Sequence, residues 1–152
     1  MSLFSNKKEL IAKADQERIV AAIRSAEAAT TGELRVYIES HCAYVDAMDR
    51  AKEVFVQLGM HQTVHRNAVI IYLAIEDRQF AIFGDEAIYI HAGGPSFWTA
   101  AANQLQQKLA SSQVAEGLAI CIQQLGNALA HHFPFTESIN KNELPDEIVF
   151  GK

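Results

Sequence analysis

Residues 68–75 (Ala-Val-Ile-Ile-Tyr-Leu-Ala-Ile) constrain the fold of this chain more than any other segment, because every one of them is apolar. The run is far shorter than the roughly 20 residues that a membrane-spanning helix needs. A strand with one face in water would alternate polar and apolar residues, whereas a strand covered on both faces is apolar throughout. The run therefore predicts the central strand of a sheet with helices on both sides.

The segments on either side of this run predict its strand partners. Residues 33–41 alternate apolar with polar or aromatic side chains and predict a strand, and residues 46–58 carry apolar residues at helical spacing. Together with 68–75 they form a βαβ unit, so the two strands are expected to be parallel. A tight turn at 76–78 leads into a third strand, 79–83, which is expected to fold back as an antiparallel hairpin.

Three more helices complete the expected elements. Helical spacing of apolar residues predicts helices at 15–29, 97–110 and 112–131, the second of them opened by a Gly-Gly-Pro-Ser sequence at 93–96. The order α-β-α-β-β-α-α predicts a three-layer α/β/α sandwich around a small mixed sheet.

The end of the chain differs in character from the rest. Residues 135–152 are rich in acids and amides, and we interpret them as an acidic tail packed on the surface of a single domain formed by residues 1–134. Residues 148–150 are apolar and are expected to dock the tail, as a short edge strand.

Composition narrows the classes of function. The chain has 152 residues, with 18 acids against 13 bases and a formal charge of −5, which argues against a nucleic-acid-binding protein. Neither GxGxxG nor GxxxxGK[ST] occurs, so no nucleotide cofactor is expected. The first residues show no apolar segment typical of a secretory signal, and we expect a cytoplasmic protein without a membrane anchor.

Histidines and cysteines give weak signals. His61 and His65 are four residues apart in an expected loop, which favours solvated side chains over a metal site, and His131 and His132 are expected to interact with the dipole at the end of the last helix. The two cysteines are interpreted as small buried hydrophobes.

Acidic residues gather at both ends of the expected sheet. The carboxyl-end group follows the ends of the two parallel strands, where open α/β sheets usually bind ligands, and comprises Glu39, Asp46, Asp49, Glu76 and Asp77. The amino-end group lies at the opposite end and comprises Glu33, Arg66, Asn67, Asp85 and Glu86. Either group offers oxygen ligands for a hard divalent cation, Ca²⁺ or Mg²⁺. The alternative for each is a set of solvated turn residues.

Several separate segments resemble one known family. Residues 31–36, 66–78 and 80–85 resemble the strands of the TPM-domain family, and the resemblance continues through 97–98, 116–118, 132–134 and 142–147. The last segments are similar to the short, soluble bacterial branch of that family. The resemblance implies a helix–sheet–helix sandwich and divalent-cation binding, often of calcium. It also implies a kinship with the thylakoid acid phosphatase and photosystem repair proteins, alongside members that are accessory proteins.

Two functions follow from this resemblance. The favoured one is a non-catalytic accessory module that binds a protein partner, with any cation only structural. The alternative is a metal-assisted acid phosphatase that acts on a small phosphoester. Its expected metal ligands are Glu33, Asp85 and Glu86, with Asp77 as a rival site. Its catalytic candidates are Asp85, Arg66 and Asn67, the arginine pairing with phosphate oxygens.

Overall fold

The computed structural model describes residues 10–136 and 148–151 of the chain. Its elements, in chain order, are α2 (Lys13–Glu27), β1 (Glu33–Glu39), α3 (Ala47–Gln57), the 3₁₀ turn η1 (Met60–Gln62), β2 (Ala68–Ala74), β3 (Gln79–Gly84), α4 (Glu86–His91), α5 (Pro95–Ala110), α6 (Val114–His132) and β4 (Val149–Phe150).

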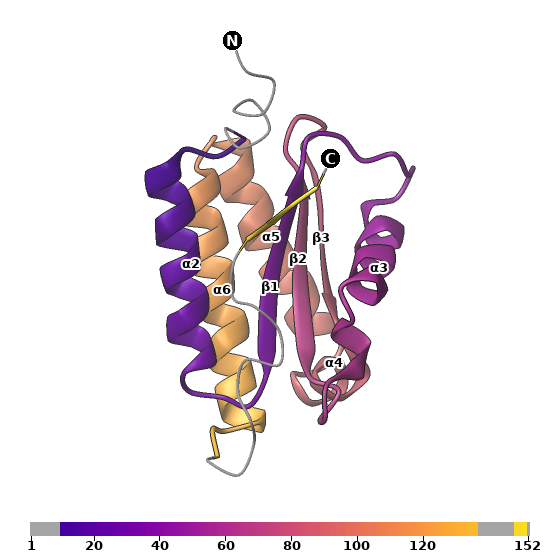
Figure 1. Ribbon diagram of the computed structural model, residues 1–152, viewed down its shortest axis with the longest axis vertical. Coiled ribbons are helices and arrows are strands. Elements are labelled where there is room, and N and C mark those ends of the chain that lie inside the picture. Colours follow the sequence, from indigo (N-terminus) through magenta and orange to yellow (C-terminus); the bar gives the residue numbers. More distant parts are fainter. Residues whose placement is uncertain (1–9, 137–147, 152) are drawn as a thin grey trace.

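The strands form one mixed sheet in the order β3-β2-β1-β4. β1 and β2 run parallel along their full lengths, with Tyr37 opposite Tyr72, and β3 runs antiparallel to β2. α2, α5 and α6 cover one face of the sheet and α3 covers the other (Figure 1). The predicted three-layer sandwich is therefore confirmed, including the parallel pair and the hairpin.

The buried strands place one apolar core on each face of the sheet. Val36 and Ile71 belong to the larger core beneath α2, α5 and α6, and Ile70 and Tyr72 belong to the smaller core beneath α3. All seven residues of β2 are buried, as its unbroken apolar sequence predicts. All seven residues of β1 are buried as well, so its polar side chains lie inside the molecule.

Element boundaries follow local signals. Asp46 caps α3, because its side chain accepts a hydrogen bond from the Met48 N–H at 2.9 Å, and Gly59 ends that helix with a left-handed φ of 72°. α5 begins at Pro95, two residues earlier than expected, because proline suits the first turn of a helix. The sequence analysis missed α4, a six-residue helix capped by Asp85.

The described part of the tail is joined to the sheet. Val149 and Phe150 pair in parallel with Tyr37 and Ile38, which confirms the expected short edge strand. The acidic stretch 137–147 lies outside the described residues. No helix in the described part of the chain is long and apolar enough to cross a membrane.

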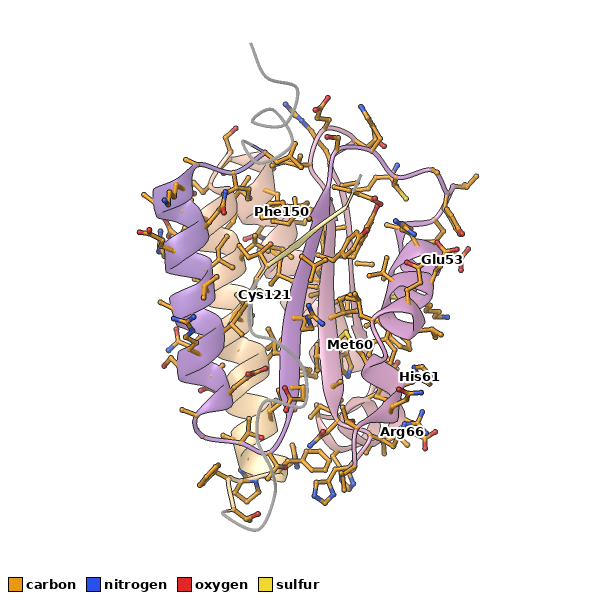
Figure 2. All side chains as sticks on the ribbon, in the orientation of Figure 1. Glu53, Met60, His61, Arg66, Cys121 and Phe150 are labelled. Carbon is orange, nitrogen blue, oxygen red and sulfur yellow. The ribbon has the colours of Figure 1, made fainter. Side chains whose placement is uncertain are left out.

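Side chains fill the space between the layers (Figure 2). Cys121 of α6 is 1% exposed in the larger core, and burial raises the pKa of its thiol to about 12. Cys121 is therefore a buried hydrophobe, as expected, whereas Cys42 in the loop after β1 is only half-buried and does not fit that expectation.

Candidate functional site

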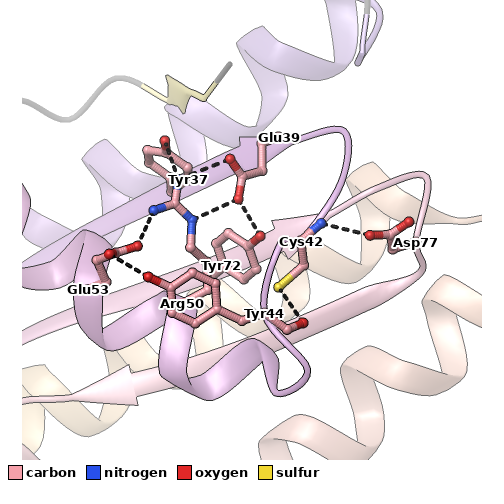
Figure 3. A network of polar contacts seen from close by, with 8 residues as sticks. All are labelled: Tyr37, Glu39, Cys42, Tyr44, Arg50, Glu53, Tyr72 and Asp77. Atoms are coloured by element: carbon pink, nitrogen blue, oxygen red, sulfur yellow. Dashed lines mark hydrogen bonds and ion pairs between the residues drawn. The ribbon is translucent and has the colours of Figure 1, made fainter.

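Glu39, the last residue of β1, is the centre of a polar network at the carboxyl ends of the parallel strands (Figure 3). Its Oε2 accepts a hydrogen bond from Arg50 Nε at 2.9 Å, and its Oε1 accepts one from Arg50 Nη2 at 3.1 Å. The Tyr72 hydroxyl donates a third, to Oε2, at 2.5 Å. Both oxygens of this buried carboxylate therefore accept hydrogen bonds from other side chains of the protein.

Arg50 extends the network from α3 to the surface. Its Nη1 donates to Glu53 Oε1 at 2.5 Å, and the other Glu53 oxygen accepts the Tyr44 hydroxyl at 2.5 Å. The guanidinium carbon lies 5.6 Å from the ring centroid of Tyr37, whose hydroxyl accepts from Arg50 Nη2 at 3.3 Å. One arginine therefore ties together β1, α3 and the loop between them.

The pKa values of this network show which charges it fixes. Burial opposes ionisation of Glu39, but the hydrogen bonds from Arg50 and Tyr72 outweigh it and leave the pKa of Glu39 below its usual value. Burial and the Glu39 carboxylate together raise the pKa of Tyr72 far above that of an exposed tyrosine. Glu39 and Arg50 therefore form an ion pair beside the neutral phenol of Tyr72.

Asp77, in the turn between β2 and β3, makes a second set of contacts in the carboxyl-end group. Its Oδ2 accepts the Cys42 backbone N–H at 2.7 Å, and its Oδ1 lies 2.8 Å from His41 Nδ1. His41 Nε2 also lies 3.4 Å from Glu76 Oε1. The hydrogen bond and charge of Asp77 raise the pKa of His41. These contacts fasten the hairpin turn to the loop that follows β1.

The amino-end group is organised by Arg66 and Asp85. Arg66 Nε donates to Asp85 Oδ2 at 2.7 Å and Arg66 Nη2 donates to Oδ1 at 2.8 Å, a two-pronged pair. Asp85 Oδ1 also accepts the Glu86 backbone N–H at 2.8 Å, which caps α4. The Glu86 carboxylate lies 3.7 Å from Arg66 Nη1 and is mostly exposed.

Glu33 and Asn67 lie deeper at the same end of the sheet. Glu33 begins β1 opposite Ala68 and is fully buried. Asn67 immediately precedes β2, is 1% exposed, and its Nδ2 donates to Thr31 Oγ1 at 3.4 Å. The structure therefore brings Arg66, Asp85 and Glu86 into contact, while Asn67 contacts the segment before β1.

The geometry of the amino-end group favours a salt bridge over a cation. Both oxygens of Asp85 are held by Arg66, so a divalent ion would have to displace the guanidinium from them. Within residues 10–136 and 148–151, no three His, Cys, Asp or Glu side chains are grouped closely enough to hold a metal ion. The assignment of Glu33, Asp85 and Glu86, or of Asp77, as ligands stays a prediction.

The sequence analysis missed Arg50 and Tyr72, the donors that hold Glu39. Arg50 lies on the polar side of a predicted helix, where charged residues are normally solvated, and the apolar run of β2 predicts only burial for Tyr72. The hydroxyl of a tyrosine in an otherwise aliphatic strand was a usable signal, because a buried phenol usually finds a hydrogen-bond partner.

The fold belongs to the class of helix–sheet–helix sandwiches, and its polar groups lie at the two ends of a small mixed sheet. The family model of the TPM domain matches residues 5–128, and this chain belongs to the TPM-domain family.

Solved structures agree with this assignment. The BA42 protein from the psychrophilic bacterium Bizionia argentinensis is 37% identical with a TM-score of 0.84, over 93% of this chain and 96% of that one. The N-terminal domain of the cg2496 protein from Corynebacterium glutamicum shares the fold, at 23% identity and a TM-score of 0.63, over 80% of this chain and 75% of that one. None of the curated proteins matches this chain.

Proposed function

We propose that this chain is a non-catalytic binding module, an accessory TPM domain that acts by contact with a protein partner. The observation that supports this most is that protein donors already fill the carboxylates of Glu39, Asp77 and Asp85. Arg50 holds Glu39, Arg66 holds Asp85, and the Cys42 N–H and His41 hold Asp77. Metal-assisted hydrolysis needs carboxylates whose oxygens face the metal, and these face arginine, imidazole and backbone N–H groups.

Hydrolysis of p-nitrophenyl phosphate in Ca²⁺, in Mg²⁺ and in EDTA tests the proposal against the phosphatase alternative. We expect no turnover that depends on metal, and the same background for the wild type, Asp85→Asn and Asp77→Asn. Turnover that EDTA abolishes and Asp85→Asn removes would establish the alternative, with Asp85 as a ligand and Arg66 as the phosphate-binding residue.

Cation binding is tested separately, by amide NMR during titration with Ca²⁺ and Mg²⁺. We expect at most weak binding at the amino-end group, because the cation competes with Arg66 for Asp85. If a cation does bind there, Arg66→Gln should tighten binding by freeing the Asp85 oxygens, and Arg24→Gln on α2 is the control. Tight binding of a cation to the wild type would contradict the interpretation that Arg66 occupies the Asp85 carboxylate.

A further inference from the structure

β3 is an edge strand whose sequence lacks the charged residues and proline that often protect a sheet edge. It is the outermost strand on its side of the sheet, and its sequence, Gln-Phe-Ala-Ile-Phe-Gly, contains no charge and no proline. Natural sheets commonly place lysine, proline or a bulge on such an edge to prevent pairing with another chain. A bare edge therefore indicates either a partner or a liability.

The pairing of β3 with β2 shows which backbone N–H and C=O groups of β3 do not hydrogen-bond to β2. The Asp85 N–H donates to the Ala68 carbonyl at 2.9 Å, and the register places Val69 opposite Gly84. Because hydrogen-bonded and non-hydrogen-bonded pairs alternate in an antiparallel ladder, the backbone groups of Ile82 and Gly84 point away from β2. No residue in the described part of the chain hydrogen-bonds to these outward groups.

The outer edge of β3 forms the floor of a groove of about 570 Å³. One wall is α3, represented by Met48 and Lys52, and the other is α4, represented by Tyr89 and Ile90. Ile90 is 69% exposed and Tyr89 is 38% exposed, so this wall presents two neighbouring apolar side chains to solvent. Arg66, marked in Figure 2, lines the end of the groove next to Asp85.

The two walls differ in chemistry. Lys52 is exposed, its ammonium lies 5.9 Å from the ring centroid of Phe83, and it forms no ion pair with any described carboxylate. The α4 wall is apolar at Tyr89 and Ile90 and carries the exposed Glu86 at its first residue. A strand added to β3 would direct alternate side chains to the two faces, one set toward Lys52 and the other toward Ile90.

From this geometry we infer that the groove binds an extended segment of a partner protein by strand addition to β3, with acidic and apolar side chains alternating along the segment. This names the partner surface of the binding function proposed above and rests on it. A second copy of this chain does not suit the groove as well, because its β3 carries no acidic side chain to face Lys52. The chain's own β4 is at the opposite edge of the sheet.

Synthetic peptides test the inference on the full-length, ¹⁵N-labelled chain. The probe is a six-residue peptide in which valine and glutamate alternate. One control has the same composition in two blocks, and the other replaces glutamate with lysine. We expect the alternating Val–Glu peptide to shift the amide signals of residues 80–84 and to slow hydrogen exchange at Ile82 and Gly84, with at least tenfold weaker binding of either control.

Variants then locate the contacts. Lys52→Glu is expected to reverse the preference, weakening the Val–Glu peptide at least tenfold and strengthening the Val–Lys peptide, whereas Lys13→Glu on α2 should change neither. Ile90→Asp should weaken both, and Val56→Asp, an exposed apolar site on α3 outside the groove, should not. Native amide spectra for all four variants show that the fold is intact.

Three outcomes would overturn the inference: no binding at millimolar peptide, signals that move away from β3, or a preference that Lys52→Glu leaves unchanged. None of these bears on the proposed accessory function, which metal-dependent phosphoester hydrolysis would overturn instead.

Discussion

At the scale of single residues, Glu39 shows how a carboxylate that looks available in the sequence becomes a structural anchor. Its side chain is 7% exposed and bonded to Arg50, which is 16% exposed. Removing one partner of such a pair leaves the other charge buried without compensation. We expect Glu39→Gln to lower the free energy of unfolding by about 3 kcal/mol in urea denaturation at pH 7. Glu53→Gln removes the more exposed partner of the same arginine and should lower the free energy of unfolding much less.

The same carboxylate predicts a pH dependence. The pKa of Glu39 lies below its usual value in the folded chain, so its ion pair contributes stability above the unfolded-state pKa, about 4.3. That contribution is lost as the pH falls through the lower, folded-state pKa. The stability gap between wild type and Glu39→Gln should therefore be constant above about pH 5 and should narrow below about pH 4. A gap that stays constant down to pH 3 would contradict the ion pair.

At the scale of elements, α4 depends on a single side chain. Asp85 caps the helix and holds Arg66, and Ile88 is the one buried residue of the helix. Asp85→Asn keeps a good cap and loses the charge, whereas Asp85→Ala loses both. We expect the alanine variant to be about 1 kcal/mol less stable than the asparagine variant, with faster amide exchange at residues 86–91. Equal stability of the two variants would show that the cap contributes nothing.

β4 is held by a close contact that only glycine allows. A Cβ added at Gly151 would collide with the Tyr37 hydroxyl and lie 2.8 Å from Glu39 Oε1. Gly151→Ala should therefore push β4 off β1 at a cost of about 1–3 kcal/mol and expose the amide that now donates to the Ile38 carbonyl. Tyr37→Phe removes the colliding oxygen, so the double variant should recover part of the loss. Failure to recover would place the strain elsewhere.

The sequence predicted elements whose signal is local and missed those that depend on distant partners. The buried β2, the hairpin and α3 follow from apolar spacing, Asp46 and Gly59, all within a few residues of the element concerned. α4 is too short for a periodic pattern, since only Ile88 is buried. The Glu39–Arg50–Tyr72 network joins three elements, and nothing in the order of residues says that Arg50 reaches β1. The acids were identified, but Arg50 and Tyr72, the donors that hold Glu39, were not.

At the scale of the whole molecule, histidines at the two ends of the sheet respond to acid in opposite directions. His41, at the carboxyl end, has a raised pKa because Asp77 hydrogen-bonds to it, so its contribution is present in acid and is lost as the pH rises through its folded-state pKa. His132, at the end of α6, has a pKa lowered by partial loss of hydration and by the charges of His131 and His91. The His91 and His132 rings lie 5.9 Å apart, so two positive charges would repel there.

The lowered pKa of His132 predicts how this residue changes the pH dependence of the chain's stability. Because its folded-state pKa is lowered, His132 binds fewer protons in the folded chain than in the unfolded chain, and its contribution to stability falls as the pH drops below about 6.5. His132→Gln should therefore lose less stability than wild type between pH 7.5 and 5.5 in urea denaturation, whereas Asp77→Asn, which frees His41, should lose more. Identical slopes of stability against pH for His132→Gln and wild type would mean that the His91 and His132 rings do not repel each other in the folded chain. A shallower slope for Asp77→Asn than for the wild type would reverse the role assigned to His41.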